Sequence, residues 1–236
     1  MHVRILTIGG TFNPVHVGHV RLAIEATEVL SFDCVEWIPC FAPRHKSGAG
    51  VLPFAWRADL LRIAVGELPG HTVDDIESTL STPSFTYHTL AALAQRKPGA
   101  ERYFLLGQNE FGRLYKWYRG RELASLTHFV VALRSSEDSI AFQRTMEEAW
   151  PESRPIAEPD AERPIYLFPS GRTVRTLLIP RLEISASLVR ERWLAGRDLR
   201  LLVPARVLRE LEARRDEVTA LWTQSSAYGA RSEAPR

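Results

Sequence analysis

Residues 9–19 read GGTFNPVHVGH and lie between an apolar run at 3–8 and a helix-like run at 20–26. A strand, a glycine turn and a helix start together form a cradle for phosphate. Glycines let the main chain approach an anion, and a helix N-terminus supplies unpaired N–H groups and a positive dipole end. His16 and His19 are three positions apart and can face one anion. The stretch lacks the G-K-[ST] ending of a Walker loop, so it predicts another kind of phosphate site.

The composition of the 236-residue chain is typical of a globular protein, with 45% hydrophobic and 25% charged residues. This length can bury the core of one α/β domain. The net charge of +2, from 30 basic and 28 acidic residues, is too balanced to favour nucleic acid or an anionic membrane as the main partner. No apolar stretch is long enough to span a bilayer, and the first residues do not have the layout of a signal peptide. We therefore expect a cytoplasmic protein.

The chain has two cysteines, Cys34 and Cys40, near the end of a predicted strand. Two cysteines cannot build a disulfide framework. We therefore expect two reduced thiols in a cytoplasmic protein rather than a disulfide or a metal site.

Strand-like and helix-like runs alternate through the first half of the chain. The alternation predicts βαβ units, and hence an α/β fold with a mostly parallel, doubly wound sheet covered by helices on both faces. Ligands in this architecture bind outside the carboxyl ends of the strands, which is where the glycine turn lies. The predicted strands are residues 3–8, 34–39, 71–76, 102–107 and 128–133, and the predicted helices are residues 18–30, 54–67, 86–95 and 110–114.

The second half of the chain is less regular. The residues at 135–138, SSED, could cap a helix that runs to about Trp150. Prolines then punctuate an acidic stretch, and we interpret residues 134–164 as a surface excursion. Short strands are expected at residues 165–168 and 176–179, and closing helices at residues 185–195 and 204–215.

These observations predict one domain at residues 1–222, with a small C-terminal helical segment at about 185–222. Residues 223–236 are polar and rich in small side chains. We therefore expect them to form a disordered tail.

Two further segments could contribute to a phosphate site. Residues 39–46 read PCFAPRHK, and a basic loop after a strand suits a lid over phosphates, with a solvated basic loop as the alternative. Residues 184–190 read ISASLVR, where Ser185 or Ser187 can cap a helix and Arg190 follows one turn later. A capped helix with a solvated arginine is the alternative for this segment.

Aromatic residues follow another predicted strand. Trp117 and Tyr118 could stack on a base or a pyridine ring, although a core tryptophan is the alternative. Residues 84–86 start a predicted helix with hydroxyls and N–H groups that can cap the helix or bind a ligand carboxylate.

Taken together, these segments resemble the bacterial nicotinate-mononucleotide adenylyltransferases, a family of the nucleotidylyltransferase superfamily with the H-x-G-H motif. The resemblance covers about residues 3–212. The first and last motifs are specific to the superfamily, and the middle ones indicate its pyridine-nucleotide branch. The matching pieces, in the family's order, lie at residues 9–19, 39–46, Arg57, residues 84–90, 107–109, 117–118, 184–190 and 202–204.

The resemblance implies a Rossmann-like fold and transfer of AMP from ATP to nicotinate mononucleotide, which gives nicotinate adenine dinucleotide and pyrophosphate in NAD biosynthesis. It implies that the mononucleotide phosphate attacks the α-phosphorus in line, that Mg²⁺ binds with the ATP phosphates, and that no covalent enzyme intermediate forms. ATP and nicotinate mononucleotide would be the partners, without nucleic acid or membrane, and a homo-oligomer stays open.

The resemblance also assigns roles by position. His16, His19, Lys46 and Arg190 would act in catalysis by holding the ATP phosphates. ATP would further be bound by Gly9, Gly10, Thr11, Phe12, Asn13, Gly107, Asn109, Ile184 and Ser187. Thr86, Trp117 and Tyr118 would hold the pyridine mononucleotide, with Trp117 stacking on the ring.

The chain departs from the family's pattern at several positions. Asn13, His88 and Asn109 stand where the family has Asp, Ala186 replaces a Ser, and residues 133–135 lack the usual Arg-Pro-Gly ending. Three carboxylates that could serve Mg²⁺ or ribose hydroxyls are therefore absent, while every cationic phosphate ligand is present. We predict an active enzyme and regard its substrate preference as open to a shift.

Three other interpretations are left open. The chain could be an adenylyltransferase for nicotinamide mononucleotide or for another phosphate acceptor such as phosphopantetheine. It could be a non-catalytic nucleotide-binding regulator, although the intact cationic residues oppose this. A fragment of a class I tRNA synthetase shares H-x-G-H, but the chain has no room for a substantial anticodon-binding domain and lacks a K-M-S-K-S-like loop.

Overall fold

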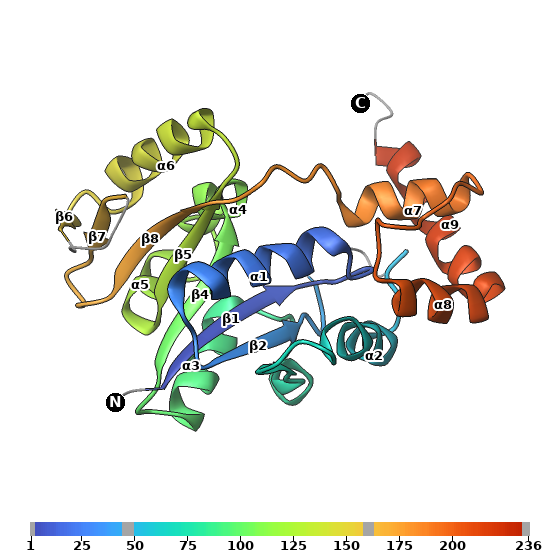
Figure 1. Cartoon of the computed structure of the whole chain (residues 1–236), viewed down its shortest axis with the longest axis horizontal. Helices are drawn as coiled ribbons and strands as arrows, with labels where there is room; N and C mark the ends of the chain where they lie inside the picture. The colour runs from blue at the N-terminus through green and yellow to red at the C-terminus, as the bar shows by residue number, and fades with distance from the viewer. Residues whose placement is uncertain (1–2, 44–49, 158–162, 233–236) are drawn as a thin grey trace. The chain divides into compact units, whose positions relative to one another are not determined.

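The computed structural model describes residues 3–43, 50–157 and 163–232, with side chains described up to residue 224. Its strands form an eight-stranded sheet in the order β3-β2-β1-β4-β5-β8-β7-β6 (Figure 1). The pairs β1–β4, β4–β5 and β5–β8 are parallel, whereas β7 runs antiparallel to both β6 and β8. The strands are β1 (Arg4–Gly10), β2 (Cys34–Pro39), β3 (His71–Val73), β4 (Glu101–Gly107), β5 (His128–Leu133), β6 (Arg154–Ile156), β7 (Ile165–Leu167) and β8 (Thr173–Leu178).

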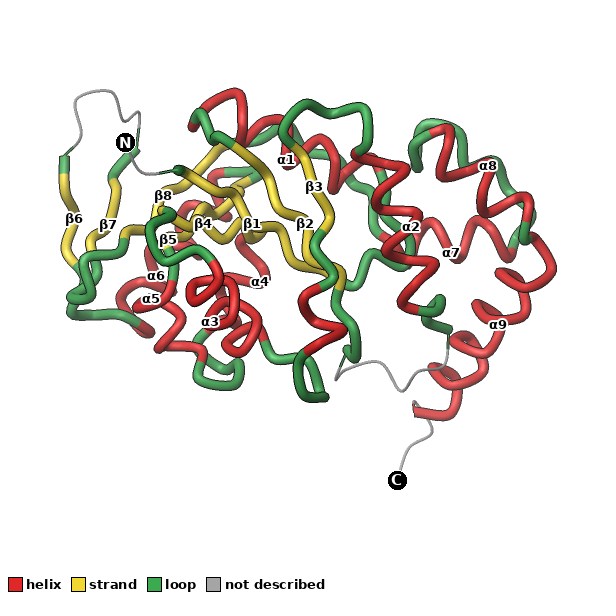
Figure 2. The backbone as a smooth tube through the Cα atoms, turned by 90° about the horizontal axis from the view of Figure 1, so that it is seen from below, coloured by secondary structure: helices red, strands yellow, loops and turns green. Residues whose placement is uncertain are grey.

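Helices connect these strands and follow them. Figure 2 shows α1 on one side of the strands and α3 and α5 on the other. The α-helices are α1 (Val17–Leu30), α2 (Phe54–Val65), α3 (Thr86–Arg96), α4 (Gln108–Leu114), α5 (Leu123–Leu126), α6 (Ser136–Ala149), α7 (Ala186–Leu194), α8 (Ala205–Ala213) and α9 (Arg215–Ser232), and the 3₁₀ helices are η1 (Ile76–Thr79) and η2 (Gly120–Glu122). None of them, as far as the chain is described, combines the length and apolar character that crossing a bilayer needs.

The strand order confirms the predicted α/β fold, because β3-β2-β1-β4-β5 is the order of a doubly wound, Rossmann-like sheet. The sheet is mixed at one edge, where β7 and β6 add in antiparallel orientation. Strand β6 was not predicted. It is three residues long and contains Pro155, which an edge strand tolerates because one side of its main chain needs no partner strand.

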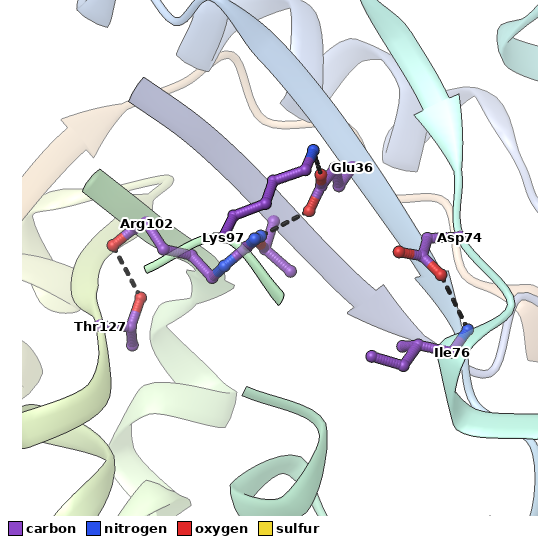
Figure 3. Close-up of polar contacts among 7 residues, drawn as sticks. Glu36, Asp74, Ile76, Lys97, Arg102 and Thr127 are labelled. Carbon is purple, nitrogen blue, oxygen red and sulfur yellow. Dashed lines mark hydrogen bonds and ion pairs between the residues drawn. The ribbon is translucent and has the colours of Figure 1, made fainter. Parts of the chain in front are cut away.

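The third predicted strand was too long. It ends at Val73, and residues 76–79 form η1 instead. The Asp74 carboxylate accepts the main-chain N–H of Ile76 at 2.9 Å, which turns the chain (Figure 3). An aspartate side chain that bonds the main chain two residues later competes with strand pairing, so the apolar Ile76 starts a helical turn.

The chain divides into two compact units. Unit 1 consists of residues 1–9, 22–36 and 85–181, and unit 2 of residues 10–21, 37–84 and 182–236. The assignment of residues 1–222 to one domain stays a prediction. Helix α9 continues to Ser232 and thus includes residues 223–232, where the sequence predicted a disordered tail.

The core of unit 1 is built on the continuous apolar run of β5, in which Phe129–Leu133 are buried. Such a run is typical of a strand covered on both faces. Phe111 on α4 stacks on Phe142 and on Trp150, with ring centroids 5.5 Å and 5.4 Å apart. The predicted helix after Ser135 is confirmed, since the Ser135 hydroxyl accepts the N–H of Asp138.

Unit 1 also buries an ion pair. Arg102 Nη1 lies 2.6 Å from Glu36 Oε2, and both side chains are nearly inaccessible (Figure 3). Lys97 Nζ reaches the other Glu36 oxygen at 2.8 Å. Burial by itself would raise the pKa of the Glu36 carboxyl, but the hydrogen bonds from Lys97 and Arg102 outweigh burial and hold this pKa below its ordinary value.

The core of unit 2 includes the C-terminal helices. Helix α7 begins after Ser185, whose hydroxyl accepts the N–H of Leu188 at 3.1 Å, so Ser185 is the cap of the two candidates, Ser185 and Ser187. Trp193 on α7 lies edge-to-face against Trp222 on α9, with centroids 5.6 Å apart. The Trp193 indole N–H donates to the Thr219 hydroxyl at 2.9 Å. Two large aromatic residues therefore join α7 to α9.

Both cysteines are free thiols, as predicted. Burial raises the pKa of the Cys34 thiol, and it raises the pKa of Cys40 to about 11. A thiol with a raised pKa is a poor nucleophile at neutral pH.

His128 lies at the start of β5 in a setting that opposes its protonation. Its Nδ1 accepts the Thr173 N–H at 3.0 Å, and the Arg172 guanidinium lies 3.2 Å from Nε2. Burial, followed by the charge of Arg172, lowers the pKa of His128 to about 4. The folded protein therefore holds this imidazole neutral.

Replacing Glu36 by Gln should lower the free energy of unfolding by about 3–5 kcal/mol, because Arg102 would be left as a buried charge without a counter-charge. Urea unfolding at neutral pH measures this change. The double variant Glu36→Leu with Arg102→Met should be more stable than Glu36→Leu alone, since it removes both charges. If Glu36→Gln lowers the free energy of unfolding by less than about 1 kcal/mol, the ion pair does not make the contribution to stability expected here.

The His128 site predicts a pH dependence of stability. The unfolded chain takes up a proton near the ordinary histidine pKa of about 6.5, whereas the folded protein does so only near pH 4. Stability from this group is therefore present above about pH 6.5 and is lost as the pH falls towards 4. Relative to the His128→Asn variant, the natural chain should lose about 1–2 kcal/mol over this interval, after allowance for solvent screening. Parallel losses in both proteins would refute this assignment.

Candidate functional site

The glycine turn, which joins the end of β1 to the start of α1, belongs to unit 2 from Gly10 onwards. The Gly10 carbonyl accepts the Cys40 N–H at 2.8 Å. Phe12 has a φ of +48°, a left-handed conformation that residues with a side chain rarely adopt. Its ring is 2% exposed and meets the His19 ring edge-on, with centroids 5.1 Å apart. Phe12 therefore supports His19 from the protein interior.

His16 and His19 form a stacked pair at the start of α1. Their ring centroids are 3.6 Å apart, and the ring planes differ by 27°. The main-chain N–H of His16 donates to Nδ1 of His19 at 3.2 Å. A neutral imidazole that accepts a hydrogen bond at Nδ1 carries its hydrogen on Nε2, so His19 has an N–H donor there. The predicted histidine pair is thus confirmed as two neighbouring rings.

A steric constraint explains why the third position of H-x-G-H, Gly18, is a glycine. A Cβ atom on Gly18 would lie 3.1 Å from Nδ1 of His16 and 3.7 Å from the carbonyl oxygen of Ile184. The first distance is tighter than ordinary van der Waals contact. Any side chain at position 18 would therefore press on the His16 ring and disturb the stacked pair.

Arg190 approaches the glycine turn from α7. Its Nη1 donates to the carbonyl oxygen of Asn13 at 2.8 Å, and its Nη2 donates to the Ser187 hydroxyl at 3.1 Å. Burial lowers the pKa of Arg190 from its ordinary value, but arginine keeps its proton in proteins at neutral pH. Unit 2 therefore brings together the predicted residues His16, His19, Arg190 and Ser187.

Asn13 and Arg57 lie beneath this group, and each is 1% exposed. The Asn13 amide N–H donates to the carbonyl of Gly50 at 2.8 Å, and its oxygen accepts the N–H of Leu52 at 3.0 Å. Arg57 donates to the carbonyls of Leu52 at 2.9 Å and Thr11 at 2.7 Å. Both side chains are bonded to the main chain, so their role is to hold the turn.

Arg57 matches the pattern of the resembled family, but the resemblance assigned no role to it. The available signal was a cationic residue within a run of apolar residues on the predicted helix at 54–67. Burial lowers the pKa of the Arg57 guanidinium from its ordinary value. Arginine stays charged when it is buried, and burying that charge is costly unless the guanidinium is well hydrogen-bonded, which the carbonyl contacts provide.

Unit 1 contains the predicted site residues Gly9, Thr86, Gly107, Asn109, Trp117 and Tyr118. Gly107 is the last residue of β4, Asn109 is exposed in the first turn of α4, and Thr86 is the first residue of α3. Gly9 is exposed, and a Cβ atom there would lie 3.3 Å from the Phe104 ring. Gly9 lies at the carboxyl end of β1, and Gly107 and Asn109 lie at that of β4, where the fold predicts ligands to bind.

The aromatic segment in unit 1 is a stack centred on Tyr118. The Tyr118 ring lies 4.3 Å from that of Phe85 and 5.4 Å from that of His88, with only 15° between the Tyr118 and His88 planes. His88 thus packs as a ring at a position where the resembled family has a carboxylate. Trp117 is half-buried, so it is neither a core tryptophan nor fully exposed.

Of the predicted basic loop at residues 39–46, residues 44–46 with Lys46 lie outside the described residues. Across the described ranges, no three His, Cys, Asp or Glu side chains gather as a metal site. The group in unit 2 combines two imidazoles, a guanidinium and the N-termini of α1 and α7. All of these favour an anion, and phosphate suits them best.

Comparison with protein families gives a match to the model described as cytidylyltransferase-like over residues 7–192. The chain is 36% identical over 212 residues to a protein of Chromohalobacter salexigens named as a probable nicotinate-nucleotide adenylyltransferase, covering 89% of this chain and 94% of that relative. A protein of the same name from Trichlorobacter lovleyi is 33% identical, covering 85% and 92%.

Among solved structures, the chain resembles the Plasmodium falciparum nicotinic acid mononucleotide adenylyltransferase complexed with NaAD. The TM-score is 0.67 at 19% identity, covering 90% of this chain and 96% of the other. At this identity the likeness shows a shared fold. The two sequence relatives also match this chain over most of its length.

Proposed function

We propose that this chain, which belongs to the cytidylyltransferase-like family, transfers AMP from ATP to nicotinate mononucleotide and releases pyrophosphate. The product would be nicotinate adenine dinucleotide, an intermediate of NAD biosynthesis. The names of relatives that share up to 36% identity over most of the chain support this activity. The motifs at residues 84–90 and 117–118 support a pyridine nucleotide as the acceptor.

The observation that carries the proposal is the group around the glycine turn. His16 and His19 lie at the start of α1, and Arg190 lies on α7, all within unit 2. A hydrogen bond to the Asn13 carbonyl joins Arg190 directly to the glycine turn. A triphosphate needs several positive or N–H groups whose positions are set before it binds. The stacked imidazoles and the anchored guanidinium meet this need.

The reaction needs positioning and charge stabilisation rather than a covalent intermediate. A phosphate oxygen of the mononucleotide attacks the α-phosphorus of ATP, and the bond from that phosphorus to the pyrophosphate oxygen breaks in line. Negative charge accumulates on the α-phosphate and on the departing pyrophosphate. His16, His19, Lys46, Arg190 and Ser187 would bind these oxygens, and the histidine N–H groups would stabilise the charge in the transition state.

The remaining site residues would bind the rest of the substrates. We assign the main chain of Gly9, Gly10, Thr11, Phe12 and Ile184 to the nucleotide, and Gly107 and Asn109 to the adenosine. The pyridine mononucleotide would contact Thr86, Trp117 and Tyr118, with the indole of Trp117 stacked on the pyridine ring.

Mg²⁺ would arrive with ATP. Mg²⁺ prefers oxygen ligands and keeps several waters, and it is held mainly by substrate phosphates in many phosphoryl-transfer sites. The described residues fit this mode, since they include no cluster of three metal-ligating side chains. The ion would neutralise charge on the phosphates, while the cationic side chains of unit 2 orient them.

The proposal includes a cytoplasmic location, with ATP and the mononucleotide as small-molecule partners. The balanced net charge of +2 and the absence of a membrane-crossing helix among the described residues support it. Both substrates are highly charged and need a site in aqueous surroundings.

The first test is steady-state pyrophosphate release with ATP and Mg²⁺, comparing nicotinate and nicotinamide mononucleotides. We expect a clear preference for nicotinate mononucleotide. A preference for nicotinamide mononucleotide or phosphopantetheine would reassign the acceptor. Tight ATP binding without turnover of any acceptor would replace the enzyme with a nucleotide-binding regulator.

Replacing His19 by Ala should lower kcat by a factor on the order of 10²–10³, because one N–H donor to the reacting phosphates is lost. The fold should persist, since His19 is half-buried and lies at a helix start. Pyrophosphate release and thermal unfolding measure the two effects. The matched control is His71→Gln, which changes a half-buried histidine of the same unit whose Nδ1 accepts the Trp37 indole N–H. A near-normal rate in the His19 variant would remove His19 from the catalytic group.

Replacing Trp117 by Ala should raise KM for nicotinate mononucleotide by about tenfold and change KM for ATP by less than about twofold. The lost stacking interaction is worth roughly 1–1.5 kcal/mol. Trp117→Phe keeps a ring and should retain most of the affinity. Equal changes in both KM values would indicate that Trp117 has a packing role.

A further inference from the structure

Asn13 joins three segments of unit 2 that are distant in sequence. Its side-chain amide bonds Gly50 and Leu52, and its main-chain carbonyl accepts Arg190 Nη1 at 2.8 Å. The residue is 1% exposed, so these contacts form away from solvent. One asparagine therefore fixes both the position of the glycine turn and the carbonyl that holds Arg190.

We propose that Asn13 is a positioning residue for adenylyl transfer, which acts on the triphosphate through Arg190. This inference rests on the proposed function. The side-chain amide of Asn13 fixes the position of the glycine turn. The main-chain carbonyl of Asn13 is thereby fixed as well, and it orients the Arg190 guanidinium through a hydrogen bond. Asn13 itself need not touch ATP through its side chain, because both ends of its amide are bonded to the main chain.

The anchoring matters because arginine is long and flexible. Ordering such a side chain costs rotamer entropy, and a guanidinium that is already anchored avoids this cost when ATP binds. Arg190 has two anchors, the Asn13 carbonyl and the Ser187 hydroxyl. Since only the first depends on the glycine turn, loss of the Asn13 amide should loosen Arg190 without breaking α7.

The contacts require an amide rather than a carboxylate. The Gly50 carbonyl accepts a hydrogen bond, and the Leu52 N–H donates one, so position 13 must offer one donor and one acceptor. An ionised aspartate offers acceptors only. It would place a buried negative charge 2.8 Å from a carbonyl oxygen, which is costly. The asparagine at a position where the resembled family has Asp is therefore explained by this chain's own main-chain geometry.

Arg57 prevents the amide from relaxing. It donates to the carbonyl of Leu52, whose N–H is bonded to Asn13, and to the carbonyl of Thr11, two residues before Asn13. Residues 11–13 and 50–52 are therefore held from both sides. A substitution at position 13 cannot be compensated by a small shift of these segments and should be transmitted to the carbonyl that Arg190 uses.

The test is a double-mutant cycle with Asn13→Asp, Arg190→Ala and the combined variant. We expect Asn13→Asp to raise the Kd for ATP and lower kcat/KM for ATP by about tenfold or more, while KM for nicotinate mononucleotide changes by less than about twofold. In the Arg190→Ala background, Asn13→Asp should change the Kd and kcat/KM for ATP by less than about a further twofold, because its effect is exerted through Arg190. Full additivity of the two substitutions would overturn the proposal.

The pH profile gives a second readout. A protonated aspartate regains a donor for the Gly50 carbonyl, so the Asn13→Asp variant should recover ATP affinity relative to the natural chain as the pH is lowered. Asn13→Ser serves as a second variant if Asn13→Asp folds poorly. Its smaller hydroxyl can bond one of the two partners, so its affinity for ATP should be lower than that of the natural chain but higher than that of Asn13→Asp. An Asn13→Ser protein with unchanged ATP affinity would also overturn the proposal.

A matched control separates positioning from stability. Thr127 in unit 1 is fully buried, and its hydroxyl donates to the Arg102 carbonyl at 2.9 Å. Thr127→Val should lower the urea midpoint without changing the Kd for ATP. If it changes that Kd as much as Asn13→Asp does, the effect of Asn13 is on stability and the proposal is wrong.

The cycle is measured on the Kd for ATP as well as on turnover, so it has a result whatever the acceptor is. A natural chain that binds ATP but does not turn over nicotinate mononucleotide would refute the proposed function and leave the test of Asn13 intact. Additive effects on ATP affinity in an active enzyme would refute the role of Asn13 alone.

Discussion

The contact between Arg190 and the carbonyl oxygen of Asn13 depends on a layer of main-chain hydrogen bonds beneath the glycine turn. Arg57 holds the carbonyls of Thr11 and Leu52, and the Asn13 amide completes the layer. The glycines of this turn can adopt many conformations, and Phe12 is held in a left-handed conformation that it does not favour. Local preference therefore does not set the shape of the turn. Buried donors supply that shape, and buried hydrogen bonds are costly to break, so the turn is rigid where the phosphates are proposed to bind.

The stacked pair of His16 and His19 shows why the residue just before His19, Gly18, has no side chain. The ring centroids are 3.6 Å apart, and one more carbon at Gly18 would lie 3.1 Å from Nδ1 of His16, closer than ordinary contact. The Phe12 ring supports His19 from the interior, so the pair is ordered by packing as well as by hydrogen bonding. Preorganised donors of this kind stabilise developing charge because they need no reorganisation during the reaction.

Unit 1 uses polar burial differently. The pair of Arg102 and Glu36 lies inside the unit, where Lys97 also contacts Glu36 and the Thr7 hydroxyl accepts a hydrogen bond from Arg102. It contributes to the structure of the unit. The aromatic stack of Phe85, His88 and Tyr118 is partly exposed, with Tyr118 at 45%, so rings from α3 and from the segment before η2 are available to a flat ligand.

The sequence by itself determined the fold class and the local chemistry, because both depend on neighbours along the chain. Alternating strand and helix patterns predicted the doubly wound sheet, and residues 9–19 predicted the phosphate cradle and the histidine pair. The tertiary structure decided what lies far apart in sequence: the bond from Arg190 to the glycine turn, the main-chain ties of Asn13, and the place of Arg57. It also decided β6, whose three residues pair only because β7 presents a free edge. Periodicity and motifs report short-range constraints, whereas these contacts come from packing between distant segments, which no local pattern encodes.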